Sequence, residues 1–478
     1  MSALVKGFGL SLVGLLAASA VQAACPVGAI QVTPGANLHS IVVAAAQGAS
    51  FCLQAGEYRM QSVRPKKNQK FYGQGNPILN GSRLITAFSR DGSFWVADNQ
   101  TQEGFQHAGE NCLEDRPRCD RPEAFFIDNS PLLAVADKAG VTVGKFFFDY
   151  DADKIYFLDD PTGKKVEASV SPYAFIGGAN GVLIQDLTVE KYSSPIQASA
   201  IGYNTPGESW VIRNNTVRLN YGVGISASSK SQIIDNTISD NGELGIGCNG
   251  SGVLIEGNEI SGNGFFSGVD PLWEGGGGKC ALTKKLIFRN NYSHDNNAYG
   301  FWTDIDNIDT LYENNRIEDN VHGGISHEIS YKAVIRNNQF KGNGFGFPVW
   351  LWGPAIQIQN SRDVEVYGNT VDQTGGYNGI ALIQQNRGSG AYGSHATRNN
   401  YVHHNRIINT AADPGASGAI ADFSPATMKA GKNRFDFNTY VVKSTALDAW
   451  AWVDGFYDWA TYRQKSRQDG HSTIEIAP

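Results

Sequence analysis

The segment VIRNNTV at 211–217 alternates apolar and polar residues around an Asn, and six later segments of the chain follow the same pattern. These segments are QIIDNTI at 232–238, VLIEGNEI at 253–260, LIFRNNYS at 286–293, TLYENNRI at 310–317, AVIRNNQF at 333–340 and VEVYGNTV at 364–371. The corresponding residues are Asn215, Asn236, Asn258, Asn291, Asn315, Asn338 and Asn369, which are spaced by 21, 22, 33, 24, 23 and 31 residues. In the first six repeats a second Asn follows five residues later, at Asn220, Asn241, Asn263, Asn296, Asn320 and Asn343. Internal repetition of this kind predicts a solenoid of stacked repeats.

The short apolar strands and the Asn turns predict a parallel β-helix. A single repeat cannot bury its own apolar face, whereas stacked repeats form a continuous core. Asn residues in register form a ladder of side-chain amide hydrogen bonds at the strand spacing, and Asn tolerates the left-handed backbone of sharp corners. An all-helical solenoid is the alternative, and the alternation of β-branched residues argues against it.

Composition narrows the function classes. The chain has 478 residues, too many for one ordinary core and typical of several domains or an elongated array. Its net charge of −7 argues against a nucleic-acid partner, which would require a basic face. The 55 Gly and three Met indicate tight turns and strands rather than a helical bundle.

The N-terminus reads as a secretory signal peptide over residues 1–23. Lys6 precedes an apolar run from Phe8 to Ala18, and Val21-Gln22-Ala23 resembles a cleavage site. The run is too short for a membrane anchor, although Cys25 leaves a lipoprotein as an alternative. We therefore predict a secreted or periplasmic protein with no membrane span, and we expect a monomer.

Six cysteines in an exported chain predict disulfides, for which fifteen pairings are formally possible. Spacing favours Cys25–Cys52 and Cys112–Cys119, which leaves Cys248 to pair with Cys280. A metal site is the alternative, but no His–Cys spacing supports one.

The chain resembles right-handed parallel β-helix proteins of the pectate-lyase-like superfamily, many of which act on carbohydrates. The repeats cover about 209–440, and the segment IQVTPGANLHSIVVAAAQGASFCLQAGEYRM at 30–60 resembles the superfamily's entry strand and capping helix. The resemblance implies an all-β, right-handed parallel β-helix with an inserted N-terminal β subdomain. The expected units are an N-terminal cap with the first coils at 24–84, the inserted subdomain at 85–172, the repeats at 173–440 and a C-terminal cap at 441–478.

Two carboxylates fall in one column of the repeat. Counting from the first Asn of each repeat, position +10 is apolar and points inward, so alternation turns +11, +13 and +15 outward. Position +13 is Asp304 in one repeat and Glu328 in the next, which places both acids on adjacent strands facing solvent. Adjacent strands lie about 4.8 Å apart, so one acid should keep its proton to higher pH. Asp306, at +15, lies diagonally from Glu328.

Long repeats flank the two that carry these acids. Their extra loops, PLWEGGGGK at 271–279 and GFPVWLWG at 346–353, should form walls beside the acids. Glu274 and Lys279 should lie above the groove, and Trp302 should form its floor. The residues expected to bind substrate are Trp302, Trp273, Trp350, Trp352, Asn249 and Gln385. Aromatic faces supply apolar area for stacking on sugar rings.

Two further residue assignments remain open. His327, at the inward position +12, is either a catalytic candidate or a hydrogen-bonded structural residue. Asp304, Asp306 and Glu328 are also suited to bind Ca²⁺, because hard cations collect carboxylates. No other cofactor is expected.

Three functions are compatible with this pattern. The favoured one is a glycoside hydrolase that acts on a polysaccharide. One of Asp304, Asp306 and Glu328 would protonate the leaving oxygen, and another would be the nucleophile or the base that activates water. Glu274 is a further candidate for the acid. The second is a calcium-dependent polysaccharide lyase, for which the superfamily implies a basic residue such as Lys279. Arg387 is a second basic candidate, but the repeat register does not place it near the acids. The third is a carbohydrate-binding protein without catalysis.

Overall fold

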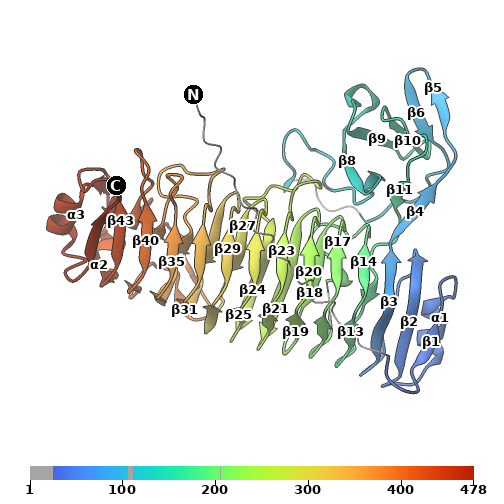
Figure 1. Cartoon of the computed structure of the whole chain (residues 1–478), viewed down its shortest axis with the longest axis horizontal. Helices are drawn as coiled ribbons and strands as arrows, with labels where there is room; N and C mark the ends of the chain where they lie inside the picture. The colour runs from blue at the N-terminus through green and yellow to red at the C-terminus, as the bar shows by residue number, and fades with distance from the viewer. Residues whose placement is uncertain (1–24, 106–110, 205) are drawn as a thin grey trace, which may run out of the picture.

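The computed structural model describes residues 25–105, 111–204 and 206–478, and the predicted signal peptide lies outside them. The chain forms an elongated right-handed parallel β-helix with a separate small sheet near its N-terminal end (Figure 1). This confirms the predicted fold class. No helix in these ranges is long and apolar enough to cross a membrane.

Each coil of the β-helix has three walls. The first wall is a twelve-stranded sheet with parallel pairing between successive coils. Its strands are β12 (Phe175–Ile176), β15 (Ser199–Gly202), β18 (Val223–Ala227), β21 (Leu244–Ser251), β24 (Gly276–Lys284), β27 (Tyr299–Asp304), β30 (Gly323–Glu328), β33 (Ile356–Gln359), β36 (Ile380–Gln384), β41 (Ser417–Ala421), β44 (Trp450–Val453) and the antiparallel β45 (Gly455–Tyr457).

A 24-stranded sheet supplies the second and third walls. The second wall contains β1 (Ile30–Val32), β2 (Ser50–Arg59), β3 (Lys70–Asn80), β13 (Leu183–Gln185), β16 (Val211–Arg213), β19 (Gln232–Ile234), β22 (Leu254–Glu256), β25 (Ile287–Arg289), β28 (Thr310–Glu313), β31 (Tyr331–Arg336), β34 (Arg362–Tyr367), β39 (Tyr401–His403) and β42 (Arg434–Asp436). The third contains β14 (Thr188–Glu190), β17 (Thr216–Arg218), β20 (Thr237–Ser239), β23 (Glu259–Ser261), β26 (Tyr292–His294), β29 (Arg316–Glu318), β32 (Gln339–Lys341), β35 (Thr370–Asp372), β40 (Arg406–Asn409), β43 (Thr439–Val442) and β46 (Thr473–Ile476). The long strands β2 and β3 continue from the second wall into the third.

The repeated Asn residues turn the chain between walls and form the predicted ladders. Asn291 Nδ2 donates to Asn315 Oδ1 at 3.1 Å, and its own Oδ1 accepts from Asn258 Nδ2 at 3.0 Å. A second ladder runs through Asn296, whose Nδ2 lies 2.9 Å from Asn320 Oδ1. These side chains are buried, so each ladder satisfies polar groups that water cannot reach.

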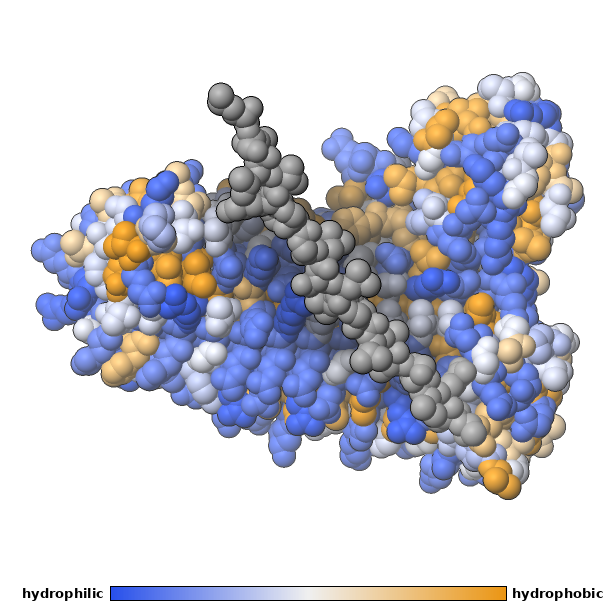
Figure 2. All heavy atoms as spheres, in the orientation of Figure 1, coloured by the Kyte–Doolittle hydropathy of each residue, from blue (hydrophilic) through white to orange (hydrophobic). Residues whose placement is uncertain are grey.

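An eight-stranded sheet emerges from the first coils and forms a subdomain with its own apolar core. Its strands are β4 (Ser82–Ile85), β5 (Ser89–Asp91), β6 (Phe94–Ala97), β7 (Phe125–Ile127), β8 (Ser130–Ala134), β9 (Lys145–Asp149), β10 (Lys154–Phe157) and β11 (Val166–Ser169), with the 3-10 helix η2 (Lys138–Gly140). Figure 2 shows mainly hydrophilic surface over the middle coils and more apolar surface on the subdomain.

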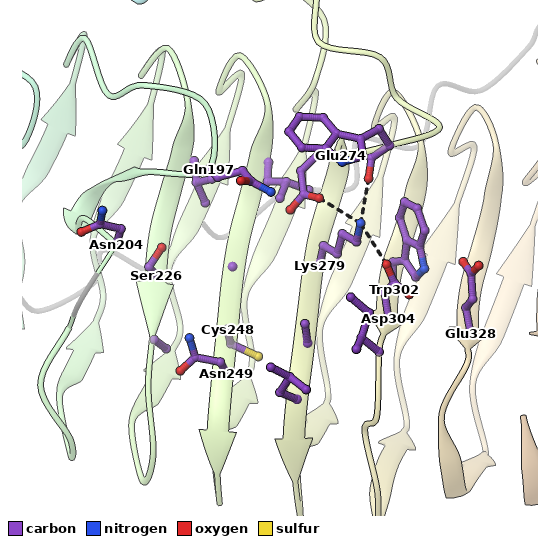
Figure 3. A pocket seen from close by; sticks show the side chains of 18 of the residues that line it. Gln197, Asn204, Ser226, Cys248, Asn249, Glu274, Lys279, Trp302, Asp304 and Glu328 are labelled. Atoms are coloured by element: carbon purple, nitrogen blue, oxygen red, sulfur yellow. Dashed lines mark hydrogen bonds and ion pairs between the residues drawn. The ribbon is translucent and has the colours of Figure 1, made fainter. Parts of the chain in front are cut away.

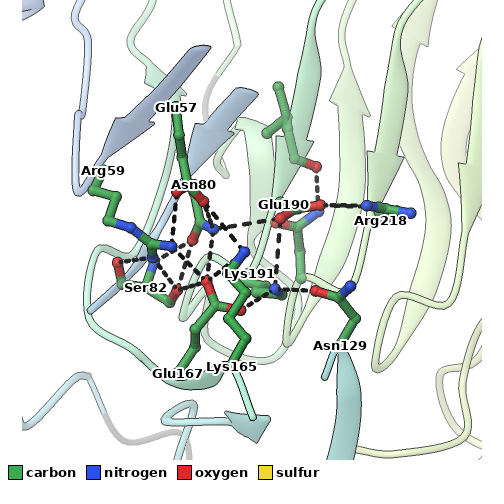
Figure 4. Close-up of polar contacts among 12 residues, drawn as sticks. Glu57, Arg59, Asn80, Ser82, Asn129, Lys165, Glu167, Glu190, Lys191 and Arg218 are labelled. Atoms are coloured by element: carbon green, nitrogen blue, oxygen red, sulfur yellow. Dashed lines mark hydrogen bonds and ion pairs between the residues drawn. The ribbon is translucent and has the colours of Figure 1, made fainter. Parts of the chain in front are cut away.

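Buried charges join the subdomain to the β-helix (Figure 4). Glu167 on β11 forms an ion pair with Lys191, and neither side chain is exposed. Arg59 Nη2 also lies 2.9 Å from Glu167 Oε1, and Arg218 Nη2 lies 2.8 Å from Glu190 Oε2. Opposite charges thus compensate one another where β3, β11 and β14 meet.

Short helices and a hairpin complete the chain. Helix α1 (Leu38–Ala44) begins at the N-cap Asn37, whose side chain accepts from Ser40 N–H. At the C-terminal end, the fully buried Tyr462 of helix α3 (Trp459–Ser466) joins the main core together with Trp450. The hairpin of β37 (Ser389–Gly390) and β38 (Gly393–Ser394) and helix α2 (Pro425–Ala430) precede helix α3 in the sequence.

The three predicted disulfides are confirmed. Cys25 is bonded to Cys52, Cys112 to Cys119, and Cys248 to Cys280. The last bond links register partners on adjacent strands β21 and β24.

Candidate functional site

The first wall brings the two predicted acids together. Asp304 at the end of β27 is the register partner of Glu328 at the end of β30. The prediction that position +10 points inward is also confirmed, because Phe301 and Ile325 are fully buried. The shared column of Asp304 and Glu328 is therefore confirmed, and its cause is the constant register between coils.

A cavity of about 540 Å³ lies over this column. Its lining includes Gln197, Asn249, Trp273, Glu274, Lys279, Trp302, Asp304, Glu328 and Arg387. We call this cavity the catalytic pocket, because it contains the acids that the sequence analysis predicts to be catalytic. Figure 3 shows Glu274, Lys279 and Asp304 turned toward one another, with Glu328 on the neighbouring strand.

Lys279 is the centre of the polar network in the catalytic pocket. Its Nζ lies 2.9 Å from Glu274 Oε2 and 3.2 Å from Asp304 Oδ2, and it donates to the carbonyl oxygen of Trp273 at 2.7 Å. The same ammonium sits 3.9 Å from the centroid of the Trp302 ring, a cation–π distance. Burial lowers the pKa of Lys279, but the two carboxylates outweigh it and raise that pKa.

Two acids in the catalytic pocket hold protons more tightly than usual. Burial raises the pKa of Glu328, and the neighbouring Asp304 raises it further, against the opposing effect of Arg387. Burial likewise raises the pKa of Glu274, although Lys279 acts in the opposite direction. A buried carboxylic acid with a raised pKa is suited to donate a proton.

The acids point away from the core but do not face open solvent. Glu328 has only 7% of its surface exposed, and the Asp304 side chain has 13%. The expectation of a solvent-facing column is wrong in this respect, because loops from neighbouring coils cover it. Part of this cover is Trp273, on the loop before β24 that was predicted as a wall.

The glycine run after that loop belongs to a strand. Gly276, Gly277 and Gly278 lie within strand β24. A Cβ on Gly277 would come within 2.2 Å of the Gly300 carbonyl oxygen, so only Gly fits there. This close packing brings Lys279 into register beside Trp302.

Arg387 lies beside the acids, contrary to the sequence-based expectation. Its Nη1 forms an ion pair with Glu328 Oε1. The residue lies in the non-repetitive segment after β36, so the repeat register did not predict its position. Its guanidinium forms one side of the catalytic pocket.

Asp306 does not join the pair. Strand β27 ends at Asp304, and Asp306 adopts a left-handed backbone with φ of 55°. Its carboxylate accepts from Ala391 N at 2.9 Å and Tyr331 OH at 3.2 Å, and pairs with His395 Nε2 at 2.8 Å. Burial acts to raise the pKa of Asp306, but these hydrogen bonds lower it. Asp306 is therefore held by Ala391, Tyr331 and His395, and it is not among the residues that line the catalytic pocket.

Asp304 and Asp306, which were considered as calcium ligands from the sequence, are bonded to different partners. Across residues 25–105, 111–204 and 206–478, no three His, Cys, Asp or Glu side chains are grouped so as to hold a metal ion. Near Asp304, the cationic partner is the Lys279 ammonium.

Trp350 and Trp352 lie outside the catalytic pocket. They pack against a small apolar cluster with Leu351, Ala381 and Phe456, toward the C-terminal coils. Their carbonyl oxygens accept from Asn378 at 3.1 and 2.8 Å. The prediction that both tryptophans wall the acids is wrong, because their loop folds onto the next coils.

Gln385 also lies outside the pocket lining. Its Oε1 accepts from Gln359 Nε2 at 2.8 Å, and that same nitrogen lies 3.2 Å from Glu328 Oε1. Gln385 is thus connected to Glu328 through Gln359, whereas Asn249 lines the pocket directly as predicted.

His327 is a structural residue of the core. It is fully buried, with Nδ1 2.7 Å from Thr303 Oγ1 and Nε2 2.9 Å from the Tyr331 carbonyl oxygen. Burial lowers the pKa of His327 to about 4. Of the two alternatives considered from sequence, the structural one matches this geometry.

Sequence reasoning missed Glu243, which lies next to the network. Glu243 is completely buried, and its carboxyl oxygens accept from Gln197 N at 2.8 and 3.1 Å. Burial raises the pKa of Glu243 well above its usual value, and Glu274 raises it further. The repeat contains no acid at the equivalent positions, so no sequence signal pointed to Glu243.

Comparisons with known proteins support the fold. Residues 199–362 match the family model described as a right handed beta helix region. A solved structure of XylC in complex with xylose has a TM-score of 0.65 and 14% identity, and the match covers 92% of this chain and 82% of that one. The A-module of the Azotobacter vinelandii mannuronan C-5 epimerase AlgE6 has a TM-score of 0.46 and 12% identity, covering 92% and 93%. No curated protein matches the sequence.

Proposed function

We propose that the protein is an exported glycoside hydrolase that acts on a polysaccharide or on oligosaccharides derived from it. The observation that carries the proposal is the pairing of Asp304 and Glu328 on adjacent strands inside one pocket. Three disulfides favour an oxidising compartment outside the cytoplasm. The XylC structure, which shares the fold, was solved with xylose, and this agrees with a sugar ligand.

The strand spacing favours a retaining mechanism. Strands about 4.8 Å apart place two facing carboxyls near the roughly 5 Å separation of retaining enzymes, below the roughly 6.5–9.5 Å of inverting ones. Glu328 protonates the glycosidic oxygen while Asp304 attacks the anomeric carbon, which breaks the glycosidic bond and forms a glycosyl ester. Glu328 then takes a proton from water, and that water attacks the anomeric carbon and releases Asp304.

The surrounding residues support these roles. Lys279 orients Asp304 through their 3.2 Å ion pair, and Trp302 provides an aromatic floor for a sugar ring.

Lys279 does not suit the lyase alternative. Its pKa is raised, because Glu274 and Asp304 outweigh the effect of burial. A base for proton abstraction must be unprotonated at the working pH, so this ammonium is better suited to holding the acids.

The test is a panel of polysaccharides and aryl glycosides digested by the mature protein. We expect products that have gained water, with retention of anomeric configuration in NMR spectra recorded early in the reaction. Glu328→Gln should lower kcat by about 10²–10⁴-fold, as expected for loss of a general acid. Glu313→Gln, the same change on β28 of the second wall, is the control.

Three outcomes would contradict the proposal. Unsaturated products that disappear with a chelator would establish a calcium-dependent lyase. Inverted products would remove Asp304 as nucleophile. Sugar binding without any turnover would identify a binding protein.

A further inference from the structure

A disulfide-closed segment of the N-terminal subdomain reaches the wall of the catalytic pocket. We call residues 111–121, which lie between β6 and β7, the arm; Cys112 and Cys119 close it. Figure 1 shows this part of the chain reaching from the subdomain toward the middle coils. There Cys112 forms an antiparallel bridge with Val269 in the loop between β23 and β24.

The arm is hydrogen-bonded to that loop through the backbone. Leu113 N donates to the Gly268 carbonyl oxygen at 2.9 Å, and Asp270 N donates to the Asn111 carbonyl oxygen at 2.9 Å. Gly268 has a φ of +83°, and a Cβ there would lie 2.4 Å from Arg116 Cβ. The arm and the loop are thus packed at a distance that only Gly permits.

Asp270 connects the arm to the catalytic pocket. Its carbonyl oxygen accepts from Trp273 N and Glu274 N, both at 3.0 Å, and its side chain accepts from Leu272 N at 2.9 Å. Glu274 then pairs with Lys279, which pairs with Asp304. A continuous chain of hydrogen bonds and ion pairs therefore leads from the arm to the proposed nucleophile.

Side-chain packing follows the same route. Cys119, Ile196 and Val269 form a buried cluster against which Cys112 and Trp273 pack. The buried Tyr221 hydroxyl lies 3.2 Å from the carbonyl oxygens of both Cys119 and Ser267, so it contacts the arm and the loop together.

We propose that the arm is a positioning element of the active site, which holds the 270–274 segment so that Glu274 and Lys279 orient Asp304. This inference rests on the proposed hydrolase function. The arm contributes no side chain to the pocket lining, so it acts through Asp270 and Glu274. The inserted subdomain is then part of the catalytic unit, although its own sheet lies away from the acids.

The test replaces the arm's disulfide by alanines, with Cys112→Ala/Cys119→Ala. The matched control is Cys25→Ala/Cys52→Ala, which removes the disulfide at the N-terminal end of the β-helix. We expect kcat to fall by about tenfold or more in the arm variant only, because small misplacements of positioning groups cost up to about 10²-fold. Circular dichroism should show the same β-sheet content in both variants.

A second readout does not depend on activity. Hydrogen–deuterium exchange at the Trp273 and Glu274 amides, which donate to Asp270, should become faster in the arm variant and stay unchanged in the control. Gly268→Ala, which forces the arm and the loop apart without touching a cysteine, should have the same effect on exchange and on kcat.

These readouts separate the two proposals. A wild-type protein that hydrolyses no glycoside overturns the proposed function. Faster exchange in the arm variant would still support the inference that the arm holds the 270–274 segment in place. Unchanged exchange at Trp273 and Glu274 in both Gly268→Ala and the arm variant would overturn the inference, whatever the activity. If the arm variant does not fold, Gly268→Ala decides the question.

Discussion

Single side chains set the proton affinities in the catalytic pocket. Glu328 lies between two opposing influences, since burial and Asp304 raise its pKa while Arg387 lowers it. Asp304 contacts Lys279 instead, at 3.2 Å. Two acids on neighbouring strands thus acquire different environments, which suits the proposed roles of Glu328 as proton donor and Asp304 as nucleophile.

Arg387→Met should shift the pH dependence of activity. The cation stabilises the carboxylate form of Glu328, so its removal raises the pKa of Glu328 and keeps the acid protonated to higher pH. We expect the alkaline limb of the kcat/KM profile to move to higher pH. Arg336→Met, which removes a guanidinium paired with Glu313 on the second wall, is the control. An alkaline limb that stays in place would show that Arg387 does not act on the proton donor.

Trp302→Ala should weaken substrate binding. Trp302 lines the pocket with 5% of its surface exposed, and the Lys279 ammonium lies 3.9 Å from the centroid of its ring. Loss of stacking on a sugar ring should weaken binding by about 0.5–1.5 kcal/mol beyond the lost apolar area. Isothermal titration with an oligosaccharide, in a Glu328→Gln background that prevents turnover, measures the effect. Affinity equal to that of the Glu328→Gln parent would remove Trp302 from the binding surface.

At the scale of elements, the Asn ladders keep the strands in register. Asn291 Nδ2 donates to Asn315 Oδ1, to the Ile255 carbonyl oxygen and to the Arg289 carbonyl oxygen, at 2.9–3.1 Å. The ladder lies at the corner between the second and third walls, one strand before the first wall that carries the acids. Register at this corner therefore sets the register of Asp304 against Glu328.

Asn291→Ala should destabilise the β-helix. The change leaves buried partners without hydrogen bonds, each at a cost of about 1–3 kcal/mol. Guanidinium unfolding should show a lower midpoint, while Asn386→Ala at an exposed position should leave it within experimental error. An unchanged midpoint for Asn291→Ala would indicate that the ladder contributes little net stability.

At the scale of the whole molecule, buried ion pairs hold the subdomain on the β-helix. Glu167 is completely buried among Lys191, Arg59 and Lys165. Burial acts to raise its pKa, but these cations lower the pKa of Glu167 to about 2. The junction bears on the proposed positioning role of the arm, because the arm extends from the same subdomain.

Stability should therefore fall in acid. The pKa of Glu167 is lower in the folded protein than in the unfolded chain, where it is about 4.3. Glu167 therefore stabilises the folded protein fully above about pH 4.3, and this contribution is lost as the pH falls toward about 2. Glu167→Gln should lower the free energy of unfolding at neutral pH by about 3 kcal/mol, because Lys191 loses a buried partner. The thermal stabilities of the wild type and Glu167→Gln, plotted against pH, should converge at about pH 2. A constant difference between the two proteins across this pH range would contradict the low pKa assigned to Glu167.

Sequence periodicity was sufficient to predict the fold and the acid pair, and the spacing of the six cysteines predicted the disulfides. The repeated Asn, and the inward residues such as Phe301 and Ile325, fix a constant register from coil to coil. Alternation then places Asp304 beside Glu328, because each position depends only on local spacing. His327 at an inward position followed from the same argument.

Only the tertiary structure showed how the loops close the catalytic pocket. Arg387 reaches Glu328 from a segment without a repeat, while Trp350 and Trp352 fold away onto later coils. Asp306 does not continue the strand alternation, because β27 ends two residues earlier, at Asp304. These positions depend on packing between segments that are far apart in the chain, and such packing leaves no periodic pattern in the sequence. The coils, in contrast, stack through a residue pattern that the sequence repeats, so the sequence alone predicts their register.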